Sequence, residues 1–213
     1  MEFNELLAIV GDEPVFESAA FLAGEVDPAN VRLQISRWTS AGRIYQLRRG
    51  LYALAPPYQK VKPHPFLVAN CLSLGSYVSG LSALAYYGMI PEAVYTTTSV
   101  TPSRPTHWET ALGRYEFQHL QPRLFFGYRL LDLGEKQSAY VAWPEKALLD
   151  LVYLQAGGDS PDYLLSLRLQ NLEQLDLEQL WRLADWAASP KLRRATGQIS
   201  RLARAEAEEY EIL

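Results

Sequence analysis

Apolar residues recur at helical spacing through the first part of the chain. A first helix is predicted over residues 2–10, and its apolar face holds Phe3, Leu6, Leu7 and Val10. A second helix is predicted over residues 18–24, with Ser18 as the N-cap and Gly24 at the end. Phe16, in the connector between them, is expected to insert into the core.

A third helix is predicted to begin at Asp27-Pro28, because Asp is a favoured N-cap and Pro is favoured at the first helical position. Val31, Ile35 and Trp38 follow at spacings of four and three, so they should point inward. Gly42 supplies the stop. The segment RIYQLRRGLYAL then predicts a hairpin with strands at 44–47 and 51–54, joined by a turn at Arg48-Arg49-Gly50.

Prolines break the pattern at Ala55-Pro56-Pro57, and this is the best domain boundary in the chain. Two buried helices are expected next, in PFLVANCLSL and SGLSALAYYGMIPE. A strand-rich middle and about four helices after Pro144 follow. We therefore predict an α+β protein. A winged helix-turn-helix occupies residues 1–56, and a mixed α/β domain that ends in helices occupies residues 57–213.

Composition narrows the class of protein. Apolar residues make up 48% of the chain, which is typical of a globular protein and too high for a disordered one. The single cysteine, Cys71, excludes an intrachain disulfide and fits a reducing compartment; its apolar surroundings predict a small buried side chain. The acidic N-terminus does not resemble a signal peptide, and no apolar run approaches the ~20 residues that span a bilayer. We expect a cytoplasmic protein with no membrane partner.

Charge is distributed unevenly. The net charge is −4, yet no Asp or Glu occurs from Pro28 to Pro91. A local basic face can attract nucleic acid even on an acidic protein, because binding depends on the field at the contact. Within this segment the cations lie between Arg32 and Lys62, and the remainder is apolar core.

The predicted third helix and hairpin carry the side chains that DNA recognition needs. A helix in the major groove uses polar side chains that reach base edges and small ones that allow close approach, while cations bind phosphates. The predicted base-reading residues of the helix are Arg32, Gln34, Ser36, Arg37, Thr39 and Ser40. The predicted phosphate contacts are Arg43, Arg48 and Arg49, with Lys60 and Lys62 just beyond them.

Other interpretations remain open at this point. One alternative is a winged helix that serves protein contacts as an adaptor, with its arginines solvated. A nuclease would need paired carboxylates and a lysine, for which Asp132, Glu145 and Lys146 are the only plausible trio; Glu145 more simply opens a helix, where its charge complements the dipole. The histidines and Cys71 lack metal-ligand spacing and no phosphate loop is present, so we predict no catalytic residues, no metal and no cofactor.

A basic run from Lys191 to Arg204 is either a solvated helix face or a second cationic surface.

Three motifs in order resemble the AbiEi-type antitoxins of type IV toxin–antitoxin systems. They are the wing from Leu47 to Tyr52, the Ser-Ala-Leu helix from Ser82 to Gly88, and the segment PEKALLD from Pro144 to Asp150. The resemblance extends over most of the chain, to about residue 190, and the order of the motifs is more specific than any one of them. The low overall charge departs from the more basic surface of many members.

The resemblance implies two roles. The winged helix would bind inverted repeats in the promoter of its own operon and repress it. The α/β domain over residues 57–213 would be an antitoxin domain that counters a cognate toxin of nucleotidyltransferase fold, with or without direct contact. Nothing in the spacing or the composition of the chain indicates this second role.

Overall fold

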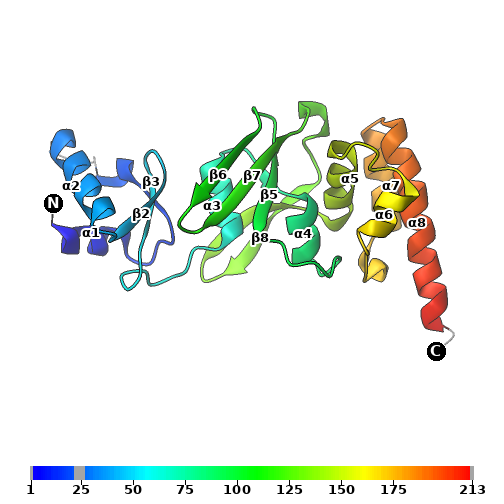
Figure 1. The fold of residues 1–213 in the computed structure, drawn as a ribbon, viewed down its shortest axis with the longest axis horizontal. Coiled ribbons are helices and arrows are strands. Elements are labelled where there is room, and N and C mark those ends of the chain that lie inside the picture. The colour runs from blue at the N-terminus through cyan, green and yellow to red at the C-terminus, as the bar shows by residue number, and fades with distance from the viewer. Residues whose placement is uncertain (1, 22–26, 212–213) are drawn as a thin grey trace.

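The computed structural model describes residues 2–21 and 27–211, with side chains up to residue 206 (Figure 1). Helices and mixed sheets alternate through this part of the chain, which confirms the α+β class. A small N-terminal unit lies at one end of the long axis, a six-stranded sheet lies in the middle, and helices α6 to α8 lie at the other end (Figure 1).

The N-terminal unit contains two α-helices and three strands within its described residues. Its elements are α1 (Phe3–Val10), β1 (Phe16–Glu17), the 3₁₀ helix η1 (Ser18–Phe21), α2 (Pro28–Ser40), β2 (Ile44–Arg48) and β3 (Leu51–Leu54). The strands form an antiparallel sheet in the order β1-β3-β2. The first and third predicted helices are confirmed. The predicted helix over 18–24 is a 3₁₀ helix through Phe21, and its remaining residues lie outside the described ones.

Local chemistry accounts for these elements. A capping box between Glu2 and Glu5 begins α1. The Asp27 carboxylate accepts a hydrogen bond from the Ala29 amide at 2.9 Å and begins α2. In the hairpin, β2 runs one residue further than predicted, so the turn is Arg49-Gly50; Gly50 has φ +84°, a conformation that favours glycine.

A compact core holds the N-terminal unit together. Phe3, Leu6 and Val10 of α1 pack against the inward face of α2, where Val31, Ile35 and Trp38 are buried as predicted. Phe16 is also buried, and its ring lies 6.0 Å from that of Tyr52 across the β1-β3 pair. The short strand β1 was not predicted, because two residues carry too little periodicity to be recognised.

The second unit is built on a mixed six-stranded sheet in the order β6-β7-β5-β4-β9-β8. The strands are β4 (Tyr77–Val78), β5 (Thr96–Thr101), β6 (Thr106–Thr110), β7 (Gly113–His119), β8 (Tyr128–Gly134) and β9 (Gln137–Ala142). The β5-β7 and β4-β9 pairs are parallel and the others are antiparallel. The runs that contain β5, β7, β8 and β9 were predicted; β4 and β6 were not.

Six α-helices complete the described part of this unit. They are α3 (Pro65–Leu72), α4 (Gly80–Tyr86), α5 (Pro144–Leu154), α6 (Pro161–Ser166), α7 (Leu177–Trp186) and α8 (Pro190–Glu211), with 3₁₀ helices η2 (Pro122–Leu124) and η3 (Leu172–Gln174) between them. Helix α5 packs against α4, α7 and α8 and so lies at the centre of the unit. The two buried helices after the boundary and the four helices after Pro144 match the prediction.

The structure has two hydrophobic cores, one within residues 3–54 and one in the second unit, and the hairpin contributes side chains to both. Leu47, Leu51 and Ala53 of the hairpin are buried in the core of the second unit, not in that of the N-terminal unit. One side of the hairpin therefore packs against the second unit and is closed to any other partner. No helix in the described part of the chain is long and apolar enough to cross a membrane.

Candidate nucleic-acid interface

The outward face of α2 carries most of the predicted base-reading residues in accessible positions. Arg32, Ser36, Arg37 and Ser40 are exposed, while Gln34 and Thr39 are partly buried. The Thr39 hydroxyl donates to the Ile35 carbonyl oxygen at 2.9 Å, so its proton is used within the helix. Of the predicted set, the four exposed residues, Arg32, Ser36, Arg37 and Ser40, are therefore the ones free to approach a base edge.

One residue of this face was missed by sequence reasoning. Leu33 is 50% exposed and lies one turn before Arg37, on the same side of α2. An exposed apolar side chain among polar ones can contact the methyl group of thymine. The signal was present in the pattern, since Leu33 falls outside the buried series of Val31, Ile35 and Trp38.

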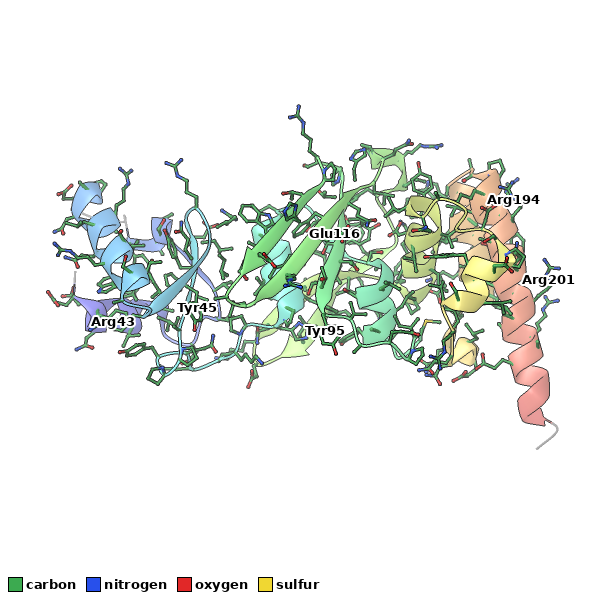
Figure 2. The ribbon with its side chains drawn as sticks, viewed as in Figure 1. Arg43, Tyr45, Tyr95, Glu116, Arg194 and Arg201 are labelled. Carbon is green, nitrogen blue, oxygen red and sulfur yellow. The ribbon has the colours of Figure 1, made fainter. Side chains whose placement is uncertain are left out.

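Arginines extend this face beyond the end of the helix. Arg43 is exposed, and its guanidinium lies 4.9 Å from the centroid of the Phe3 ring (Figure 2). Arg49 is exposed at the tip of the hairpin. Among the residues that the structure describes, no carboxylate pairs with Arg32, Arg37, Arg43 or Arg49. We call these four exposed arginines, together with Ser36, Ser40 and Leu33, the α2 face.

Arg48 is placed differently from its neighbour. Its side chain is only 22% exposed and pairs with the Glu17 carboxylate at 3.5 Å. Its Nε donates to the Cys71 carbonyl oxygen at 3.2 Å, and one terminal nitrogen donates to the Arg49 carbonyl oxygen at 3.2 Å. The guanidinium is thus held between the N-terminal unit and α3, where it has partners of its own.

The long acid-free segment does not remain acid-free once the chain folds. Lys60 pairs with Asp12 at 3.2 Å, and Arg48 pairs with Glu17, so carboxylates from the preceding segment neutralise two of its cations. Lys62 is exposed, and its carbonyl oxygen accepts a hydrogen bond from Gln137 in β9. The cationic surface is therefore smaller than the sequence predicted and is centred on α2.

A buried polar cluster in the second unit was not predicted. Lys146 in α5 donates to the Tyr77 hydroxyl at 2.9 Å and to Asp150, one helical turn further along. Asp150 also accepts from the Tyr77 hydroxyl at 2.9 Å and from the Ser79 hydroxyl at 2.8 Å. All four residues are buried, so the cluster fixes α5 against β4.

Burial dominates the electrostatics of this cluster. It lowers the pKa of Lys146 and raises that of Asp150, and the attraction between the two charges offsets part of each change. It also raises the pKa of the Tyr77 hydroxyl, with the neighbouring Asp150 carboxylate acting in the same direction. The Lys146 ammonium lies 5.1 Å from the Phe126 ring centroid and 5.6 Å from that of Tyr77, which adds cation–π stabilisation.

The carboxylates and lysine considered for a nuclease have separate partners. Glu145 is buried and accepts from the Asp176 amide at 2.9 Å and from the Gln179 side chain at 3.0 Å. Asp132 is exposed in β8, where it accepts from the Gly134 amide at 2.9 Å. Glu145 thus joins the first turn of α5 to the start of α7. Among the described residues, no group of three or more His, Cys, Asp and Glu side chains is placed to hold a metal ion.

The basic run of α8 is largely neutralised at its beginning. Arg193 pairs with Asp185 at 2.8 Å and Arg194 with Asp159 at 2.7 Å, while Lys191 donates to backbone carbonyl oxygens near the end of α5. Arg201 donates to the Gly197 carbonyl oxygen within the helix. Arg194 and Arg201 lie at the end of the molecule opposite Arg43 (Figure 2), so α8 does not extend the α2 face.

Comparison with models of protein families finds no match to this chain, and comparison with curated proteins finds none either.

Proposed function

We propose that residues 1–56 form a winged helix that binds double-stranded DNA, with α2 in the major groove and Arg49 on a phosphate. The observation that carries this proposal is the α2 face, whose exposed arginines pair with no carboxylate in the described part of the chain and accompany the small polar residues Ser36 and Ser40. The order α1-β1-η1-α2-β2-β3 and the sheet order β1-β3-β2 support it, because they place a hairpin beside the candidate recognition helix.

Within this proposal the contacts divide by role. Arg32, Ser36 and Arg37 read base edges, since they leave the helix on its outward side. Arg43 and Arg49 neutralise phosphates on either side of the groove. Arg48 is assigned to holding the hairpin on α3, because its donors already have acceptors in the chain.

The test is binding to the DNA upstream of the protein's own gene. Fluorescence anisotropy measures the affinity over a range of salt concentrations. Arg49→Ala should weaken binding and lower the slope of log affinity against log salt by about one. Arg123→Ala is the matched control, since Arg123 is exposed in η2 of the second unit and forms no ion pair with any residue that the structure describes. Salt-insensitive binding, or an equal effect of the two variants, would refute the assignment.

We further propose that the protein is the antitoxin of a type IV toxin–antitoxin system and represses its own operon. This rests on the resemblance of its three ordered motifs to AbiEi-type antitoxins. The partner would be a toxin of nucleotidyltransferase fold, and the promoter DNA would contain inverted repeats. The second unit would carry the antitoxin role.

Co-expression with a neighbouring gene for a nucleotidyltransferase-fold protein tests this role. The wild-type chain should restore growth, and Arg49→Ala should restore it equally while losing repression of a promoter reporter. Growth inhibition that the wild-type chain does not relieve would remove the antitoxin role and leave DNA binding untouched. Equal loss of both activities in Arg49→Ala would contradict the division of roles between the two units.

A further inference from the structure

A pocket of about 230 Å³ lies between the sheet of the second unit and three of its helices. Strands β5 and β7 form its floor, and its walls come from the start of α4, the second half of α5 and the first half of α6. Sites for drug-sized ligands measure roughly 300–1,000 Å³, so this pocket suits a smaller molecule. We call it the Glu116 pocket. No residue of the α2 face lines it.

The pairing of the strands shows which side chains face the Glu116 pocket. In the parallel β5-β7 pair Gln118 lies opposite Val100, and Glu116 precedes Gln118 by two residues, so the three side chains share one face of the sheet. Tyr77 of β4 also lies opposite Val100, and its hydroxyl donates to Asp150 of α5. Helix α5 therefore packs on this same face, and Glu116 points to the side of the sheet where the pocket lies.

Glu116 gives the pocket a negative charge that has no counter-ion. No Lys, Arg or His among the described residues lines the pocket. Glu116 is partly buried, accepts a hydrogen bond from the Gln118 side chain at 2.9 Å, and forms no ion pair with any residue that the structure describes. Arg114, the preceding residue of β7 on this face, pairs with Glu109 at 2.7 Å. A partly desolvated carboxylate without a counter-ion favours a cationic ligand.

A second carboxylate in the lining, that of Asp150, does not add to this charge. Asp150 pairs with the Lys146 ammonium, which itself does not line the pocket. The pocket therefore has one uncompensated negative charge, at Glu116, and a ligand with a single positive charge matches it.

The rest of the lining suits an alkyl ammonium ion. Its ammonium group has three N–H donors and needs several acceptors. The Gln118 side chain uses its nitrogen to donate to Glu116, which leaves its oxygen to accept beside the carboxylate. Four aliphatic side chains in the lining can cover an alkyl chain, and burial of that chain favours binding. They are Leu81, Val100, Leu151 and Leu154.

We propose that the Glu116 pocket binds a small primary alkylamine in its protonated form. The ammonium pairs with the Glu116 carboxylate and donates to the side-chain oxygen of Gln118, while the alkyl chain lies against the leucines. Figure 2 shows Glu116 on the middle sheet, well apart from Arg43 along the long axis, so this site and the α2 face are separate surfaces of one chain. The proposal does not depend on DNA binding.

The full-length protein is titrated by calorimetry with isoamylamine at pH 7 and low salt. The amine should bind saturably with 1:1 stoichiometry, whereas isoamyl alcohol, which has the same shape and no charge, should not bind measurably. Glu116→Gln removes the charge and keeps the size of the side chain, so it should weaken binding at least tenfold. Leu81→Trp fills the pocket without changing its charge and should weaken binding to a similar extent.

Two control variants make the same kinds of change outside the pocket. Glu173→Gln removes an exposed carboxylate of η3, and Leu165→Trp enlarges an exposed leucine of α6. Both should bind the amine like the wild type. Absence of saturable binding overturns the proposal, as does equal binding of the alcohol. Equal weakening by Glu116→Gln and Glu173→Gln also overturns it, because the amine would then respond only to the net charge of −4.

Discussion

The Arg48 guanidinium in β2 donates a hydrogen bond to the carbonyl oxygen of Cys71 in α3, across 23 positions of the chain. This contact joins the hairpin of the N-terminal unit to the second unit. Leu47 and Leu51 flank it in the sequence and are buried in the same core as α3. The hairpin is therefore a shared element of the two units, and Arg48 satisfies a carbonyl oxygen at the junction.

Replacing Arg48 should mainly lower the folding stability of the protein and have less effect on its contact with DNA. We expect Arg48→Ala to reduce the free energy of unfolding by ~2 kcal/mol, because a partly buried charged hydrogen bond is lost and the Cys71 carbonyl oxygen is deprived of this donor. Arg49→Ala, one residue along and exposed, should stay within ~0.5 kcal/mol of the wild type. Urea denaturation of both variants measures the difference. Equal stabilities would show that the junction does not depend on Arg48.

The two adjacent arginines also show what a sequence can and cannot predict about the candidate site. The sequence correctly predicted exposed cations on α2 and at the hairpin tip. It did not predict that Arg48 is partly buried and paired while Arg49 is exposed. This difference depends on which side of the hairpin meets α3 and on the position of Glu17 beside Arg48. The pairing of Lys60 with Asp12 was not predicted for the same reason. Like the Arg48–Glu17 pair, it is formed only by the tertiary fold.

The elements that were predicted from the sequence are those long enough to show a periodic pattern of apolar residues. Helix α2 was predicted from its cap, its inward series and Gly42, all local signals. Strands β4 and β1 are two residues long and owe their existence to neighbours in the sheets. The cluster around Lys146 was missed because Tyr77 lies 69 positions away, and only the packing of α5 on β4 brings the two together.

The cap of α2 offers a way to weaken the α2 face indirectly. Asp27→Ala removes the acceptor of the Ala29 amide and should cost about 1 kcal/mol of stability. Asp27→Ser keeps a capping oxygen and should retain most of that stability. If α2 binds DNA, Asp27→Ala should weaken binding without changing its salt slope, since no cation is lost. Anisotropy at several salt concentrations reads both quantities, and a lowered slope would contradict this explanation.

Protonation of His64 should destabilise the protein in mild acid. Burial lowers the pKa of His64 in the folded chain below the ordinary value of about 6.5. As the pH falls through 6.5 the unfolded chain binds this proton before the folded chain does, so stability falls until the folded pKa is passed. Its Nδ1 also accepts from the Phe66 amide and would lose that role if protonated there.

The variant His64→Asn keeps an N-cap acceptor for α3 but does not titrate. The wild type should lose stability relative to this variant between pH 7.5 and pH 5.5, measured by urea midpoints at each pH. His107 and His119 are present in both proteins, so their contributions cancel in the comparison. A constant difference across this range would show that His64 has the same pKa in the folded and unfolded chains.

The Lys146–Asp150 pair should show strong energetic coupling, because each charge is buried and has the other as its counter-ion. Lys146→Met and Asp150→Asn each leave one buried charge uncompensated, and each should cost ~3–5 kcal/mol. The double variant leaves no uncompensated charge, so its cost should be smaller than the sum of the two by at least ~1 kcal/mol. Denaturation of the four proteins completes the cycle, with Glu178→Gln/Arg182→Met of the exposed α7 pair as a control expected to couple by less than ~0.5 kcal/mol. Additive costs for Lys146 and Asp150 would mean that Tyr77 and Ser79 satisfy each group separately, and the pair would then not hold α5 on β4.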